Sequence, residues 1–306
     1  MNTLENITND YLVFCQNQKR LDSKTIKAYR IDLKQFYTWV SVDSFSKLSP
    51  ATIESYISTL HQKYKPKTAK RKIASLKAFF HYLELKDYID KNPMRKIQTK
   101  FREPKTLPKT IPLNTIESFL SAMYKQKPLA QSAYQQKCIT RDIALIELLF
   151  ATGMRISELC TLHPSDVNLQ ERTILIYGKG AKERKIHIGN DDVISILYEY
   201  EQKFTSDMDE CGYYFVNRLK KRLSEQSVRE MINKYASLAA IDLHITPHMF
   251  RHSFATYLLE SDVDIRYIQE MLGHSSINVT EIYTHVAMSK QKNILETKHP
   301  RLHFSL

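Results

Sequence analysis

Glycine is almost absent from this chain, and its placement restricts what the first half can fold into. The 306 residues contain six glycines, all between Gly153 and Gly273. Average usage of about 7% would give roughly 21 in a chain of this length. Glycine serves tight turns and left-handed backbone positions. We therefore predict that the first 150 residues are almost continuously helical.

Apolar residues at helical spacing divide residues 1–88 into four amphipathic segments. The first covers about 4–20, the second begins at Asp22 or Ser23, and the fourth follows Pro66. The third begins at Ser49 and Pro50, because serine is a good N-cap and proline fits the first helical position. Residues 1–88 are therefore predicted to form a four-helix bundle.

Prolines and basic residues alternate in residues 89–113, which separate this bundle from the rest of the chain. Proline disfavours continued helix and stiffens a segment. We interpret 89–113 as a basic, semi-extended linker that lies along a phosphate backbone or serves as an ordinary solvated hinge. Residues 114–306 are expected to be a second, mostly helical domain. In it, 173–177 and 184–188 form an antiparallel hairpin around the GKGAKE turn.

The positive charge is concentrated in the first third of the chain. Residues 1–110 hold 22 Lys and Arg against 10 Asp and Glu, whereas the remainder holds 23 of each. A basic excess on a folded segment indicates a polyanion, most often nucleic acid, or a solubilising lysine-rich surface. On charge alone these two interpretations are equally good.

Several classes are disfavoured by composition. No apolar run approaches the ~18 residues of a membrane span, and MNTLENITND lacks the pattern of a secretory signal. The four cysteines are far apart and form no CxxC pair, which argues against a disulfide framework or a cysteine-rich zinc site. We therefore expect a protein of the reducing cytoplasm.

Four segments of the second domain carry candidate chemistry: ATGMRISEL at 151–159, YGKGAKER at 177–184, TPHMFRH at 246–252 and LGHSSINVTEIYTH at 272–285. On a helix, His248, Arg251 and His252 share one face. His248 and His252 have zinc-ligand spacing, but no HExxH glutamate or third ligand accompanies them, so no metal is predicted. GKGAKE lacks the third glycine of GxGxxG, so no nucleotide cofactor is predicted either.

Together, the runs ATGMRISEL, GKGAKER, HMFRH, LGHSSI and IYTHV resemble the tyrosine recombinase (phage integrase) family, and within it the short Xer-like members. The order and approximate spacing are the family's, and the resemblance covers essentially the whole chain. One departure is Phe250, where many members have leucine. The resemblance implies a mainly α fold whose two domains form a C-shaped clamp on double-stranded DNA. It also implies a cytoplasmic, nucleoid-associated enzyme without cofactor.

The resemblance implies six catalytic residues: Arg155, Lys179, His248, Arg251, His274 and Tyr283. The two arginines would grip the scissile phosphate with planar forks, and His274 would donate a further hydrogen bond. Tyr283 would be the nucleophile, giving a 3′-phosphotyrosine whose bond energy allows rejoining without ATP. Lys179 would be the general acid, and His248 would assist proton transfer from Tyr283 or orient the phosphate.

Further residues are assigned supporting roles. Glu158 either holds Arg155 or is an ordinary surface acid, and His252 either supports the phosphate pocket or simply packs. Positive residues of the first domain and linker are expected to contact DNA phosphates: Lys63, Lys65, Lys67, Lys70, Arg71, Lys72, Arg95, Lys96 and Lys100. The cluster 220–222 either faces DNA or is a solvated loop.

The expected function is site-specific recombination between two short DNA sites through a Holliday junction. The resemblance implies a homotetramer in the synapse, with or without a second recombinase or regulator. A helix over 287–297 would dock in a neighbouring protomer or pack in cis. One alternative is a type IB topoisomerase-like enzyme that relaxes DNA, which intermolecular strand exchange would distinguish. The other is a catalytically silent DNA-binding protein, against which the complete residue set argues.

Overall fold

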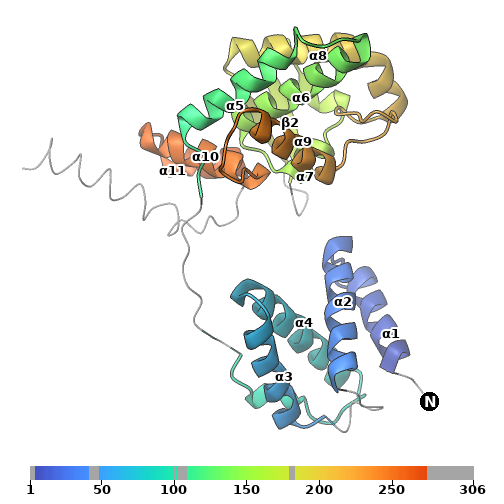
Figure 1. Ribbon diagram of the computed structural model, residues 1–306. Helices are drawn as coiled ribbons and strands as arrows, with labels where there is room; N and C mark the ends of the chain where they lie inside the picture. The colour runs from blue at the N-terminus through green and yellow to red at the C-terminus, as the bar shows by residue number, and fades with distance from the viewer. Residues whose placement is uncertain (1–3, 41–47, 100, 102–108, 179–182, 274–306) are drawn as a thin grey trace, which may run out of the picture. The chain divides into compact units, whose positions relative to one another are not determined.

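A computed structural model describes residues 4–40, 48–99, 101, 109–178 and 183–273 of the chain (Figure 1). The chain divides into two compact units, Met1–Pro104 and Lys105–Leu306. Lys100, Lys179, His274, Tyr283 and the helix expected over 287–297 lie outside the described residues. The clamp arrangement of the two units stays a prediction.

The first unit contains the four predicted helices: α1 (Leu4–Asn17), α2 (Ser23–Val40), α3 (Pro50–Lys63) and α4 (Pro66–Leu85). The Ser49 hydroxyl accepts from the amide of Thr52 at 3.2 Å, so the predicted cap begins α3. An aromatic core joins the helices. The rings of Tyr11 and Phe79 lie 5.1 Å apart between α1 and α4, and both residues are fully buried.

Packing in the first unit continues past residue 88. Ile89, Met94 and Ile97 are buried in its core, and Pro93–Lys96 forms a 3₁₀ helix, η2. The amide of Asn92 donates to the Glu84 carboxylate at 3.1 Å, which ties η2 to α4. Proline starts a helical turn here instead of extending the chain. Residues 89–97 therefore belong to the first unit rather than to the predicted linker.

The second unit is a helical body with a small sheet. Its helices are α5 (Leu113–Gln126), α6 (Ala133–Thr152), α7 (Ile156–Cys160), α8 (Asp191–Cys211), α9 (Glu225–Leu238), α10 (Pro247–Glu260) and α11 (Ile265–Leu272). Helix α6 lies at its centre, packed against α5, α8 and α10 (Figure 1). It begins at Ala133, because Ser132 caps its first turn. Ile111 is fully buried in this core, so the unit also begins before the predicted residue 114.

The sheet has three antiparallel strands in the order β1 (Val167–Asn168), β2 (Thr173–Tyr177) and β3 (Glu183–His187). Thr173 lies opposite His187 and Tyr177 opposite Glu183, which confirms the predicted hairpin. Ile174, Ile176 and Ile186 turn into the core. In β3, Arg184 has the parity of Ile186 and lies opposite Ile176, so it also turns inward.

Candidate active site

The end of α6 places Arg155. Gly153 ends the helix with φ +59°, and a Cβ there would lie 2.5 Å from Cδ1 of Phe254, so only glycine fits. The chain then turns through buried Met154, and Arg155 is the N-cap of α7 in an extended conformation. Its side chain is 30% exposed, which leaves part of the guanidinium accessible.

Glu158 holds Arg155 in two ways. The Arg155 amide donates to Glu158 Oε2 at 2.9 Å, and its Nη1 donates to Oε1 at 2.7 Å. The Glu158 side chain is only 6% exposed. The hypothesis that this acid anchors Arg155 is therefore confirmed, and the interpretation as a surface acid is wrong.

Arg184 of β3 binds the same carboxylate. Its Nη2 donates to Glu158 Oε2 at 2.7 Å and its Nη1 to Oε1 at 3.2 Å. Burial by itself would raise the pKa of Glu158, but the hydrogen bonds from Arg184 and Arg155 outweigh burial and hold that pKa below its usual value. The acid is therefore ionised at neutral pH.

Arg251 lies one turn into α10, which has Thr246 as its N-cap and Pro247 as its first residue. It is 6% exposed, and its Nη1 and Nη2 donate to the carbonyls of Gly153 and Leu272 at 2.8 and 2.6 Å. Burial and the positive charge of Arg155 lower the pKa of Arg251 to about 9, so it stays charged at pH 7. Two like charges held close together favour a bound anion.

His248 precedes Arg251 by one turn on the same face of α10. Partial burial, then the charges of Arg251, Arg229 and Arg155, lower the pKa of His248 below its ordinary value of 6.5. The imidazole is therefore neutral at pH 7 and able to accept a proton. His252 is half-buried in the next turn, and its place in a phosphate pocket stays a prediction.

The structure thus brings Arg155, His248 and Arg251 together at the ends of α6 and α11 and the starts of α7 and α10. Helix α11 ends at Leu272 and is capped by Gly273 with φ +63°, directly before residue 274 in the sequence. Strand β3 begins directly after residues 179–182. Lys179 and His274 therefore lie in sequence next to described residues of this site, whereas Tyr283 comes further along the chain. The roles of all three residues stay predictions.

Most of the predicted DNA-contacting residues of the first unit lie around the start of α4. Lys63, Lys65, Lys67 and Lys70 are exposed. Lys72 is different, because its side chain is 4% exposed and its ammonium lies 2.9 Å from Asp32. Its charge is paired with Asp32 inside the bundle, so Lys72 is not among the phosphate contacts that we propose.

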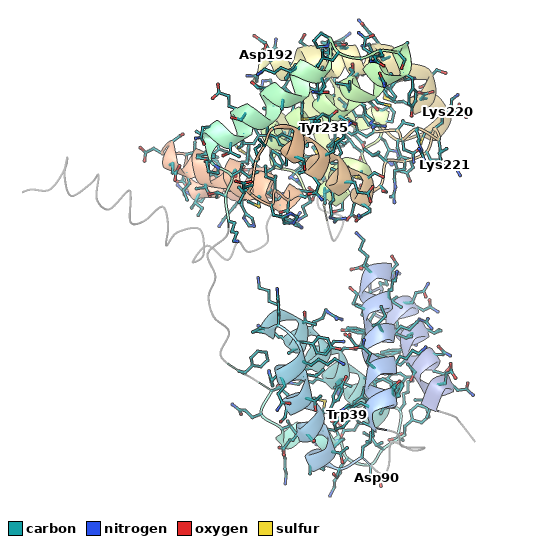
Figure 2. The ribbon with its side chains drawn as sticks, viewed as in Figure 1. Trp39, Asp90, Asp192, Lys220, Lys221 and Tyr235 are labelled. Atoms are coloured by element: carbon teal, nitrogen blue, oxygen red, sulfur yellow. The ribbon has the colours of Figure 1, made fainter. Side chains whose placement is uncertain are left out.

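The other basic residues have varied surroundings. Arg71 is 44% exposed and pairs with Asp32, while Arg95 pairs with Glu84 at 3.0 Å and keeps 71% exposure. Lys96 is exposed. Figure 2 shows Lys220 and Lys221 at the periphery of the second unit. Lys220 pairs with Glu210 at 2.8 Å, so its charge is already balanced locally.

The described part of the chain contains no group of three or more His, Cys, Asp or Glu that could hold a metal ion. Within the same residues, no helix has the length and apolar character to cross a membrane.

Arg184 is a functional candidate that was not predicted from the sequence. Arg184 is the last residue of the run GKGAKER, but the run alone does not predict what the Arg184 side chain binds.

Comparisons with known proteins cover both units. The phage integrase family matches residues 111–290, and the N-terminal SAM-like domain of phage integrase matches residues 8–87. A tyrosine recombinase of Agathobacter rectalis is 61% identical over 304 residues, 99% of each chain. The tyrosine recombinase XerD of Listeria innocua is 34% identical, covering 97% of this chain and 100% of its own.

A solved structure shares the fold. The XerH site-specific recombinase, bound to a palindromic difH substrate in a post-cleavage complex, superimposes with a TM-score of 0.75 at 24% identity. The alignment covers 95% of this chain and 84% of XerH.

Proposed function

This chain belongs to the phage integrase family of tyrosine recombinases, and from that membership we propose that it recombines DNA at short specific sites. The observation that carries the proposal is the frame around two arginines. Arg155 is fixed by buried Glu158, and Arg251 by two backbone carbonyls. Preorganised cationic donors of this kind stabilise the charge that a phosphodiester gains in the transition state.

The reaction we infer is a transesterification. The Tyr283 oxygen attacks the scissile phosphorus, the bond from phosphorus to the 5′-oxygen breaks, and a 3′-phosphotyrosine forms. His248, neutral at pH 7, accepts the tyrosine proton directly or orients the phosphate. Lys179 gives a proton to the leaving 5′-oxygen, and His274 donates to a non-bridging oxygen. Attack by a second 5′-hydroxyl then rejoins the strand without ATP.

The exposed lysines Lys63, Lys65, Lys67 and Lys70 supply sequence-independent phosphate contacts, with Arg71, Arg95, Lys96 and Lys100. Strand exchange between two sites requires four protomers, so we infer a homotetramer on double-stranded DNA, acting on the nucleoid in the cytoplasm. The four cysteines are free, in keeping with a reducing compartment. Relatives along the whole chain are recombinases, which favours this function over DNA relaxation alone.

Covalent capture on genomic DNA tests the proposal and identifies the site. The protein is incubated with sheared genomic DNA, denatured in SDS, and the DNA that stays attached is sequenced. We expect enrichment of a short site with the unmodified chain and none with Tyr283→Phe, which should still bind DNA.

Tyr267→Phe is the matched control, because Tyr267 is 61% exposed on α11 and should leave capture unchanged. Two recovered sites on separate molecules should then exchange strands. Capture that persists with Tyr283→Phe would remove the assigned nucleophile. Relaxation without intermolecular exchange would favour a topoisomerase.

A further inference from the structure

Arg184 binds two separate segments of the second unit from its place in β3. Its side chain is 7% exposed. The Nη atoms donate to both oxygens of Glu158, at 2.7 and 3.2 Å, as a fork. Its Nε donates to the carbonyl of Met271, at the end of α11, at 2.8 Å. One guanidinium thus links β3, α7 and α11.

The contact with Glu158 acts on Arg155. A buried carboxylate is costly unless its charge is compensated and its oxygens are hydrogen-bonded. Arg184 supplies the second cation, so Glu158 is bound on both oxygens while Arg155 keeps 30% exposure toward solvent. The fork also fixes the orientation of the carboxylate that positions Arg155.

The contact with α11 acts on the segment before residue 274. The last carbonyls of a helix lack partners within the helix. Here Arg184 satisfies Met271 and Arg251 satisfies Leu272, at 2.8 and 2.6 Å. Gly273 lies directly on Arg184, since a Cβ there would be 3.1 Å from Arg184 Cδ. Two arginines from different elements therefore hold consecutive residues at the end of α11.

We propose that Arg184 is a positioning residue of the strand-cleavage reaction. It orients Arg155 through Glu158, and it ties the start of β3 to the end of α11. These are the points at which the segments bearing Lys179 and His274 join the described site. The inference rests on the proposed function, and it adds a residue that touches neither the phosphate nor the nucleophile in that scheme.

Single-turnover cleavage of the captured site tests the inference. Arg184→Met should lower the cleavage rate constant at saturating DNA by about 10- to 100-fold, because a displacement of about 1 Å in the catalytic groups can cost about 100-fold. The Kd for DNA should stay unchanged. The rate constant of Arg184→Lys should lie between those of the wild type and Arg184→Met. Lysine keeps the charge but cannot bind both Glu158 oxygens and the Met271 carbonyl at once.

A second substrate separates positioning of Arg155 from a merely structural effect. With a methylphosphonate in place of the scissile phosphate, one non-bridging charge is absent and an oriented Arg155 matters less. The ratio of wild-type to variant rates should therefore fall toward one. Lys185→Met is the matched control, because Lys185 is the next residue of β3, is 61% exposed, and pairs with Glu171 at the surface.

If Arg184→Met slows cleavage of the phosphate and the methylphosphonate substrates by the same factor, the inference is overturned. A wild-type cleavage rate of Arg184→Met on the phosphate substrate would overturn it as well. If Arg184→Met does not fold, Arg184→Lys and the neutralised pair Glu158→Gln/Arg184→Met carry the same comparison. Absence of any covalent complex with the unmodified chain would refute the proposed function itself. The two failures are therefore distinguishable.

Discussion

Replacing Lys72 by methionine separates structural charge from DNA-binding charge in the first unit. The Lys72 ammonium lies 2.9 Å from Asp32 Oδ1, with the two side chains 4% and 1% exposed. It also contacts Gln35, and its ammonium lies 4.8 Å from the Tyr64 ring centroid. Removing one partner of a buried pair costs about 3–5 kcal/mol. Arg71 still binds Asp32, so we expect the lower end, about 3 kcal/mol.

The loss is large enough to measure in the intact chain. For a domain of this size, 1 kcal/mol shifts the melting midpoint by about 4–8 °C, so Lys72→Met should melt about 12–24 °C lower. Trp39 is the single tryptophan of the chain and lies in the first unit (Figure 2). Its ring centroid lies 5.1 Å from that of Tyr56. Its fluorescence therefore reports the unfolding of this unit.

Lys67→Met is the matched control on the same helix. Lys67 is exposed, so this change should leave the melting midpoint in place and weaken DNA binding. The double variant Asp32→Leu/Lys72→Met should recover most of the lost stability, because an apolar pair often replaces a buried ion pair without loss. If Lys72→Met keeps the wild-type midpoint and weakens DNA binding as Lys67→Met does, the structural interpretation of Lys72 is refuted.

Three further results are expected. Alanine at Lys65 or Lys67 should each make the slope of log K against log[salt] shallower by about 0.9, and an unchanged slope would place the phosphate contact elsewhere. Arg229→Gln should move the acid limb of the cleavage pH profile to higher pH, because Arg229 is one of the charges that lower the pKa of His248; an unmoved limb would mean that another group titrates. Lys179→Ala should recover on a 5′-bridging phosphorothiolate, whose sulfur leaves without a proton, and equal impairment on both substrates would remove Lys179 as the general acid.

Local rules predicted the elements of this fold well. Serine before proline correctly predicted the start of α3. The GKGAKE turn between two short apolar runs placed the hairpin. Caps, turns and amphipathic spacing act within a few residues, so they can be read directly from the chain. The two-residue β1 was not predicted, because its pairing with β2 decides it.

Roles of charged side chains were predicted less well, because they depend on distant partners. In sequence, Lys72 looks like part of a solvated basic run, and only Asp32, forty residues earlier, makes it a buried residue. The sequence left two roles open for Glu158, and it gave no sign that Arg184, 26 residues later, binds the same carboxylate as Arg155. Arg251 was predicted from its motif, but its carbonyl partner in Gly153 lies 98 residues away.

The helices, the hairpin and the family could all be predicted from the sequence, because they follow from local spacing and from motifs in a set order. Scarcity of glycine predicted a helical first half. Gly153 and Gly273, which the structure describes next to the site, end helices with positive φ, and a Cβ would lie 2.5 Å from Phe254 at Gly153 and 3.1 Å from Arg184 at Gly273. Which charges are exposed to solvent and which are paired inside the bundle depends on the tertiary structure. A buried charge needs a partner, and long-range packing alone determines which residue provides it.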